Sequence, residues 1–277
     1  MKLVAVSMIL LAICCSARSL GAQSAAMSPH DEAAMNLEKK GDIEGAIAEY
    51  KLALQENPAN ADSHYNLAQL LARKQDYAAA IGQFRETLKI TPNDPDAHND
   101  LGLALKNSGD KGGAEHEYNE ALRLNPKLAT AHVNLGNLRY MEKQLAPAMA
   151  EYRAAIAANP ANPESHMSLG NVMDDTGDTD GAIKEYKEAI RLAPNDVQAH
   201  YNLSISLAKK KDEAGALSEL RVVEKLDPES PTPHIWLMRI LMGSDPKAAL
   251  QECRTADGLT HDAKVHDLCE KLAAHIK

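Results

Sequence analysis

Residues 95–128 read PDAHNDLGLALKNSGDKGGAEHEYNEALRLNPKL, and this stretch decides the fold. Apolar residues follow a helical spacing from Asp96 to Asn107 and again from Lys111 to Leu124. Between the two segments, Ser108-Gly109-Asp110 is typical of a tight turn, and Asn125-Pro126 ends the second segment. The stretch therefore predicts two amphipathic helices joined by a short turn.

The same pattern recurs every 34 residues along most of the chain. The histidines with this spacing are His30, His64, His98, His132, His166, His200 and His234. The prolines are Pro58, Pro92, Pro126, Pro160, Pro194 and Pro228. Because a fixed period of 20 to 50 residues is typical of stacked repeats, the sequence predicts a solenoid of helix pairs.

Three further series keep the period and predict how the helices pack. Small residues on the first helix of each unit are expected to approach an alanine series on the second helix, where larger side chains would force the pair apart. The small residues are Ala34, Ala68, Gly102, Gly136, Gly170 and Ser204, and the alanines are Ala46, Ala80, Ala114, Ala148, Ala182 and Ala216. The wider gaps are expected to be filled by Tyr50, Phe84, Tyr118, Tyr152, Tyr186 and Leu220.

These positions resemble the signature of the tetratricopeptide repeat family, as shown in the third unit by His98, Leu101, Gly102, Leu105, Ala114, Tyr118, Ala121 and Pro126. The resemblance implies an all-α, right-handed superhelical α-solenoid of helix-turn-helix repeats. Six units are expected at residues 27–60, 61–94, 95–128, 129–162, 163–196 and 197–230. A degenerate seventh follows at residues 231–259, and a capping helix within 260–277 would cover the exposed end. In the fourth unit, Arg139 departs from the family pattern because it stands where other units have leucine.

The composition agrees with close helix packing. Hydrophobic residues make up 44 % of the chain but aromatic residues only 4 %, which favours small-residue helix contacts over a sheet. The net charge is −9, so nucleic acid is not expected as a partner.

The first 22 residues have the features of a signal peptide. Lys2 precedes the apolar run Leu3–Cys15, and Leu20-Gly21-Ala22 offers small residues before a cut that would leave Gln23 first. The run is too short for a stable membrane span, which needs roughly 20 residues. Lipidation at Cys14 is disfavoured because Ile13 stands where a lipobox has Gly or Ala. We therefore expect an exported chain that is periplasmic or secreted after cleavage.

Two cysteines, Cys253 and Cys269, remain beyond the predicted signal. In an exported protein they could form one disulfide bond near the C-terminus. The alternative is two buried thiols, and the sequence does not decide between them.

Searches for catalytic and metal-binding patterns find none. The periodic histidines would lie a whole repeat apart, so they cannot converge on one ion and are expected to pack helices. His261, His266 and Cys269 have the wrong spacing for one helical face. Since no phosphate loop, nucleophile elbow or dinucleotide fingerprint occurs either, we expect no enzyme activity, no cofactor and no metal.

One row on the first helices is the candidate binding site. In the resembled family these helices line the concave face, and the row consists of Asn66, Asp100, Asn134, Ser168 and Asn202. It is similar to the asparagine ladder in the superhelices of O-linked N-acetylglucosamine transferases, although this chain has no catalytic domain. We expect Asn66, Asp100, Asn134 and Asn202 to bind an extended peptide with help from Tyr65 and Tyr201. The alternative is that these polar residues are only solvated.

The carboxylate clamp of other family members needs inward-facing Lys or Arg, but this chain has Asp62, Asp96, Thr130 and Gln198 at those positions. A basic or neutral peptide is therefore expected. The leading function is a non-catalytic scaffold for a protein or peptide partner. The alternative is an accessory subunit that recruits substrate for a separate enzyme or envelope assembly complex. A monomer and weak self-association both remain open.

Overall fold

The computed structural model describes residues 27–260 and 262–276, which form fifteen helices and no strand. The predicted signal, residues 1–22, and His261 lie outside the described residues. The helices are α1 (Pro29–Lys39), α2 (Ile43–Glu56), α3 (Ala61–Arg73), α4 (Tyr77–Ile90), α5 (Pro95–Ser108), α6 (Lys111–Leu124), α7 (Ala129–Met141), α8 (Leu145–Ala158), α9 (Pro163–Asp175), α10 (Thr179–Leu192), α11 (Val197–Lys209), α12 (Glu213–Leu226), α13 (Thr232–Leu241), α14 (Pro246–Thr260) and α15 (Ala263–His275). The prediction of an all-α repeat solenoid is confirmed.

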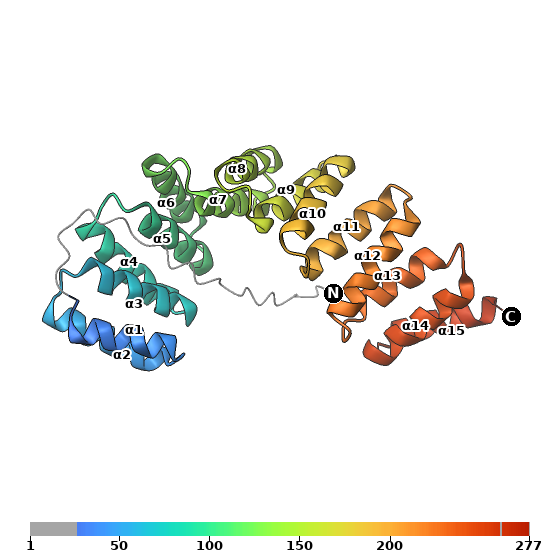
Figure 1. Cartoon of the computed structure of the whole chain (residues 1–277), viewed down its shortest axis with the longest axis horizontal. Coiled ribbons are helices and arrows are strands. Elements are labelled where there is room, and N and C mark those ends of the chain that lie inside the picture. Colours follow the sequence, from blue (N-terminus) through green and yellow to red (C-terminus); the bar gives the residue numbers. More distant parts are fainter. Residues whose placement is uncertain (1–26, 261, 277) are drawn as a thin grey trace.

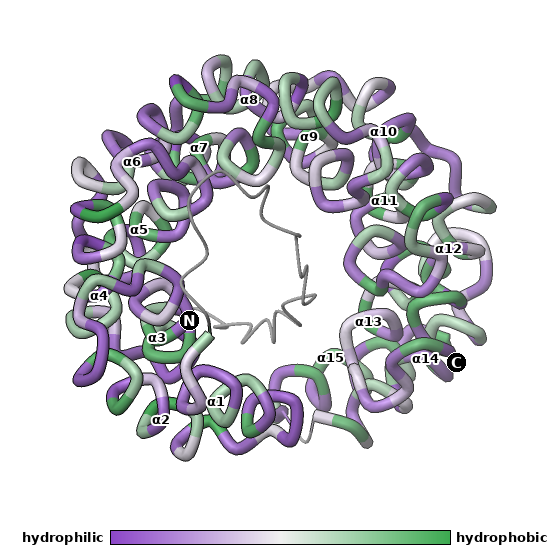
Figure 2. Tube along the Cα trace, turned by 60° about the vertical axis from the view of Figure 1, so that its left-hand side comes forward, coloured by the Kyte–Doolittle hydropathy of each residue, from purple (hydrophilic) through white to green (hydrophobic). Residues whose placement is uncertain are grey.

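The helices stack in sequential pairs along a curved solenoid (Figure 1). In Figure 2, where the solenoid is seen as a ring, the odd-numbered helices α1 to α13 form the inner layer of the curve and the even-numbered helices α2 to α14 form the outer layer. The inner layer therefore carries the row of polar residues from the sequence. Among the described residues, no helix is both long and apolar enough to cross a lipid bilayer.

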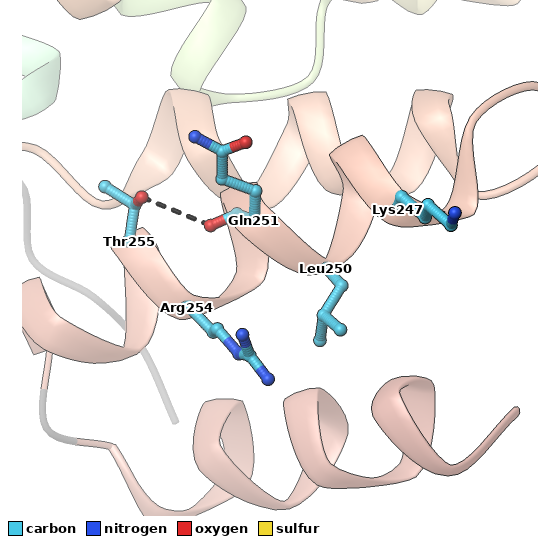
Figure 3. A pocket seen from close by; sticks show the side chains of 5 residues that line it. All are labelled: Lys247, Leu250, Gln251, Arg254 and Thr255. Atoms are coloured by element: carbon cyan, nitrogen blue, oxygen red, sulfur yellow. Dashed lines mark hydrogen bonds between the residues drawn. The ribbon is translucent and has the colours of Figure 1, made fainter. Parts of the chain in front are cut away.

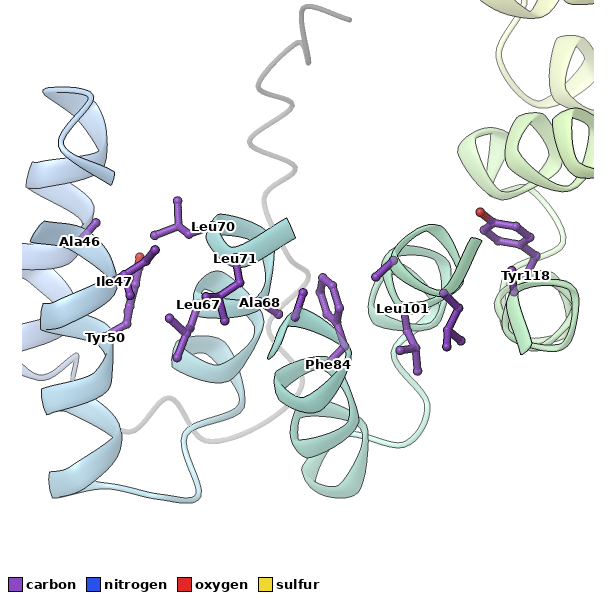
Figure 4. Packing of buried hydrophobic residues seen from close by; sticks show 14 of the residues in the cluster. Ala46, Ile47, Tyr50, Leu67, Ala68, Leu70, Leu71, Phe84, Leu101 and Tyr118 are labelled. Carbon is purple, nitrogen blue, oxygen red and sulfur yellow. The ribbon is translucent and has the colours of Figure 1, made fainter. Parts of the chain in front are cut away.

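The periodic core residues lie between the layers, as Figure 4 shows for the N-terminal units. The alanine series is fully buried, and the aromatic series is at most 2 % exposed. One packing expectation is corrected. A Cβ added to Gly102 would lie 2.7 Å from Cε1 of Tyr118, and one added to Gly136 would lie equally close to Tyr152. The glycines therefore make room for the tyrosine of their own unit rather than chiefly for the alanine series.

The turns within the units differ in which residue adopts the positive φ angle and in whether the second helix is capped. Gly41, Gly109 and Gly177 adopt positive φ angles of 80°, 99° and 89°, a region that glycine enters without steric cost. At the equivalent position the other units hold Gln75, Lys143 and Lys211, with φ between 63° and 64°. In most units the next residue is an aspartate that caps the second helix, whereas Gln144 in the fourth unit makes no side-chain cap bond.

Replacing Lys143-Gln144 by Gly-Asp, the pair found at Gly109-Asp110, is expected to raise the free energy of unfolding. The aspartate supplies the missing N-terminal cap of the second helix. The glycine removes the steric cost of a positive φ angle at a residue with a side chain. Each change is worth about 1 kcal/mol. Urea denaturation followed by circular dichroism would measure the gain. The reverse change, Gly109→Lys with Asp110→Gln, is the control and should lose a similar amount. No change in either variant would contradict this account of the turns.

The C-terminal end is closed by α15, which packs on α14. Cys253 on α14 and Cys269 on α15 form a disulfide bond, with their Cα atoms 5.5 Å apart. Both cysteines are buried in a small cluster with Met238 and Ala249. The bond therefore fastens the last helix to the last repeat.

Candidate peptide-binding surface

The polar row lies on five successive inner helices. Its members are half-buried on α3, α5, α7 and α11, while Ser168 on α9 is buried. Because its hydroxyl is buried, Ser168 is not expected to form a hydrogen bond with a partner, unlike the other members of the row. The residues with accessible polar atoms are Asn66, Asp100, Asn134 and Asn202.

Asp100 is the centre of a small hydrogen-bond cluster. Its Oδ2 accepts from the Tyr65 hydroxyl at 2.7 Å and from Gln69 Nε2 at 3.1 Å. Its Oδ1 accepts from Asn99 Nδ2 at 3.1 Å. Burial nevertheless raises the pKa of the Asp100 carboxyl, against the effect of these donors. Burial therefore disfavours the charged form of this carboxyl group, and the three donors offset part of that effect.

The amides of the row are held by neighbouring side chains. Asn134 donates from Nδ2 to Asn99 Oδ1 at 2.9 Å. Asn202 donates from Nδ2 to Asn171 Oδ1 at 2.9 Å and accepts from Gln198 Nε2 at 2.7 Å. The bonds to Asn99 and Asn171 join adjacent units, the Gln198 bond lies within α11, and together they fix the orientation of the Asn134 and Asn202 amides.

These hydrogen bonds leave part of the donor and acceptor capacity of each amide unused. A side-chain amide has two N–H donors and a carbonyl with two lone pairs. Within the described part of the chain, Asn134 uses one donor, and Asn202 uses one donor and one lone pair. Asn66 lies near the Tyr50 hydroxyl, which donates to Glu38 Oε1 at 2.7 Å. Each amide keeps the capacity to bind a peptide group.

The two tyrosines expected to contact a peptide are themselves packed. The Tyr65 ring meets Phe84 edge-on, with ring centroids 5.8 Å apart. Tyr201 meets Trp236 in the same way, with centroids 6.5 Å apart. Both tyrosines remain half-buried, so each presents one part of its ring in a fixed orientation.

Charged residues on neighbouring inner helices bridge the units. Tyr140 donates to Asp175 Oδ2 at 2.6 Å, and Lys209 Nζ lies 2.6 Å from Asp174 Oδ2. On α5, burial lowers the pKa of the half-buried Lys106 ammonium group. The middle of the inner layer therefore contains both signs of charge, with acids in excess on α5 and α9.

Sequence reasoning missed Asn99, Asn171, Trp236 and Arg239. Asn99 and Asn171 lie at different repeat positions, so a search along one period could not link both to the amide row. Trp236 is the single tryptophan of the chain, and this alone could have marked it as a candidate contact residue.

The periodic histidines connect the two layers. His98 Nδ1 lies 2.6 Å from Glu117 Oε2, and its Nε2 lies 3.1 Å from the Pro92 carbonyl oxygen. Both oxygens only accept hydrogen bonds, so the ring donates from both nitrogens when it is protonated. The same two contacts recur at His132, His166 and His200. In the fourth unit, Arg139 also pairs with the histidine's partner, at 2.7 Å.

Stability is expected to fall as the pH rises past neutrality. The hydrogen bonds that the rings of His98 and His132 donate to Glu117 and Glu151 raise the pKa values of these two histidines. A raised pKa in the folded state adds stability that is complete below the unfolded value of about 6.5 and is lost as the pH rises through the folded value. Urea unfolding between about pH 6 and about pH 8.5 would measure this slope. The double variant His98→Gln, His132→Gln should have a shallower slope, and an unchanged slope would contradict the assignment.

Other candidate sites offer less. Among residues 27–260 and 262–276, no group of three or more His, Cys, Asp or Glu side chains is placed to hold a metal. His266 is paired with Asp257, and Cys269 is in the disulfide. A wide-open hollow on α14 is lined by Lys247, Leu250, Gln251, Arg254 and Thr255 (Figure 3). Its polar groups do not converge on a common point, so we assign it no function.

Comparisons with known proteins agree with this architecture. A family model described as tetratricopeptide repeat matches residues 32–95 and 99–163, and a second repeat model of the same name matches residues 175–211. Together they match more than half of the chain. A comparison with curated protein sequences found no match.

Several solved structures share the fold. YrrB, described as a TPR protein with an unusual peptide-binding site, is 21 % identical with a TM-score of 0.60 over 68 % of this chain and 97 % of its own. PilF of Pseudomonas aeruginosa is 18 % identical with a TM-score of 0.67, covering 76 % and 96 %. MamA of Desulfovibrio magneticus RS-1 is 25 % identical with a TM-score of 0.55, covering 61 % and 96 %.

Proposed function

Because the chain belongs to the tetratricopeptide repeat family, we propose that it is a non-catalytic scaffold that binds an extended segment of a partner protein along its inner helices. The observation that carries this proposal is the pair of oriented, incompletely used amides at Asn134 and Asn202, which stand in one row with half-buried Asn66. The peptide-binding site named for YrrB, a protein of the same fold, supports it further.

The physical reason is the match between an amide and a peptide backbone. An extended segment exposes one N–H and one C=O per residue, and an asparagine can satisfy both. The amides are already held by Asn99, Asn171 and Gln198, so less side-chain entropy is lost when a peptide binds. Recognition through backbone groups would tolerate many sequences, and the side chains between the amides would select among them.

We also propose that the chain works outside the cytoplasm. The N-terminal run around Leu3–Cys15 supports export, and the Cys253–Cys269 bond suits an oxidising compartment. Mass spectrometry of the protein from its producing cells would test this. The expected mass is that of a chain beginning at Gln23 with the disulfide intact, and a full-length chain in which all four cysteines are free thiols would contradict export.

Replacing Asn66, Asn134 and Asn202 together by alanine is expected to weaken peptide binding by tenfold or more. Each lost hydrogen bond to a peptide group is worth about 1 kcal/mol, so three lost bonds exceed one factor of ten. The ligands would be selected from a displayed random peptide library on the unaltered protein and titrated as synthetic peptides.

A matched control removes three amides from the outer helices, namely Gln55, Asn119 and Gln251, all exposed on α2, α6 and α14. This control should bind the selected peptides as the unaltered protein does. Circular dichroism would verify that both variants keep their helices. If the two variants bind equally well, the inner amides are not the binding site.

A further inference from the structure

The inner layer changes in charge toward its C-terminal end. Acidic residues occur on α1, α3, α5 and α9, whereas α7, α11 and α13 contain none, so α11 and α13 are the one neighbouring pair of described inner helices from α1 to α13 without an acid. Their basic residues are Lys209, which is paired with Asp174, and Arg239. In a chain with a net charge of −9, two adjacent inner helices without an acid form a distinct surface.

Arg239 is the centre of that surface. Its guanidinium carbon lies 5.1 Å from the centroid of the Trp236 ring, a cation–π contact that holds an exposed side chain in place. Within the described residues, Arg239 makes no ion pair. Arg221 on the outer helix α12 is by contrast paired with Glu252. The donor fork of Arg239 is therefore oriented and available.

Tyr201 adds a second donor from the neighbouring helix. Its ring packs edge-on against Trp236, with ring centroids 6.5 Å apart. A tyrosine hydroxyl can donate one hydrogen bond as well as accept. Ile205 on α11 and Ile240 on α13 are half-buried in the same two helices. Ile205 follows Tyr201 by four residues and Ile240 follows Trp236 by four residues, a spacing that puts each pair on one face of its helix.

We propose that Tyr201, Trp236 and Arg239 form a carboxylate-binding subsite for an Asp or Glu side chain of the bound segment, next to an aliphatic residue of that segment. This inference rests on the proposed peptide-binding function. An arginine fork fits a carboxylate in two parallel hydrogen bonds, and stacking on Trp236 reduces the entropy that ordering the fork would cost. The bound segment is expected to continue past this subsite and not to end at it, because α13, α14 and α15 extend the solenoid beyond Tyr201.

The subsite also sets the direction of the segment. Asp100 on α5 and the acids on α9 favour a basic or neutral stretch, whereas α11 and α13 attract an acidic one. A segment with opposite charges at its two ends can therefore bind well in one orientation only. The expectation of a basic or neutral peptide then applies to the middle of the inner layer and not to its C-terminal end.

The test compares peptides selected from a displayed random library by the unaltered protein and by Arg239→Gln. Trp236 is the only tryptophan, so its fluorescence reports directly on this subsite when synthetic peptides are titrated. Peptides selected on the unaltered protein should be enriched in Asp or Glu beside an aliphatic residue, and this enrichment should vanish for Arg239→Gln. Arg254→Gln, an exposed arginine on α14, is the matched control.

The selected peptide is then made with its acidic residue changed to the amide, and separately with an amidated C-terminus. Loss of the side-chain carboxylate should weaken binding to the unaltered protein about tenfold, and Arg239→Gln should bind both versions equally. The amidated peptide should bind like the free acid. A loss on C-terminal amidation alone, or equal binding of all peptides by Arg239→Gln and the unaltered protein, would overturn the subsite while leaving the scaffold proposal intact. If no peptide is enriched on the unaltered protein, both proposals fail.

Discussion

Tyr152→Ala is expected to lower the free energy of unfolding by about 3–5 kcal/mol, the range for removing a large buried aromatic side chain. Tyr152 is 1 % exposed, and its ring covers the space left free at Gly136. Its hydroxyl donates to Asn137 Oδ1 at 2.6 Å. Alanine would leave a cavity between the two helices of the unit and an acceptor without its donor. Urea denaturation followed by circular dichroism measures the loss.

A matched pair of phenylalanine variants separates the hydroxyl from the ring. The Tyr118 hydroxyl is buried without a hydrogen-bond partner in the described structure, because Leu103 stands where the fourth unit has Asn137. Tyr118→Phe should therefore leave stability unchanged or raise it, whereas Tyr152→Phe should lose about 1 kcal/mol. Equal costs for the two variants would contradict the assigned bonding, and a loss well below 3 kcal/mol for Tyr152→Ala would contradict the packing.

Removing the disulfide by Cys253→Ala with Cys269→Ala is expected to destabilise the last helix pair by about 3 kcal/mol. The bond closes a loop over a sequence separation of 16, and both sulfurs are buried against Met238 and Ala249. Amide hydrogen exchange should become faster in α15 and along α14. Because contacts in a solenoid are between neighbouring units, exchange around Tyr152 should stay the same.

The control for that experiment is the unaltered protein after reduction with a thiol, which should give the same exchange pattern. Faster exchange throughout the chain would instead mean that the cap stabilises the whole solenoid. No change in α15 would mean that its packing on α14 holds it without the bond.

Much of the fold followed from periodicity. The 34-residue repeat predicted the helix pairs, and the buried alanine and aromatic series confirm which faces meet. The contacts of Gly102 were predicted less well, because a repeat pattern shows that a small residue is needed but not which side chain approaches it. The pairing of His98 with Glu117 was also missed, although a glutamate recurs nineteen residues after most of the periodic histidines.

The candidate site was predicted in part. Periodicity placed Asn66, Asn134 and Asn202 on one inner row, but the bonds to Asn99 and Asn171 depend on how far adjacent units turn relative to each other. The rotation between adjacent units is set by the packing of whole helices, so it cannot be predicted from the residue at any single repeat position. Trp236 follows Asn202 by one 34-residue period, but periodicity does not show that Arg239 stacks on its ring.

The central claim is that a partner lies along the inner helices. Photo-crosslinking in the producing cells tests it most directly, with a light-activated residue at exposed Met141 on the inner helix α7 or at exposed Arg153 on the outer helix α8. The account predicts that Met141 crosslinks to a defined extended segment of one protein, that Arg153 does not, and that the triple amide variant loses the crosslink. Crosslinks to the same protein from Arg153 alone would place the partner on the outer layer and contradict the account.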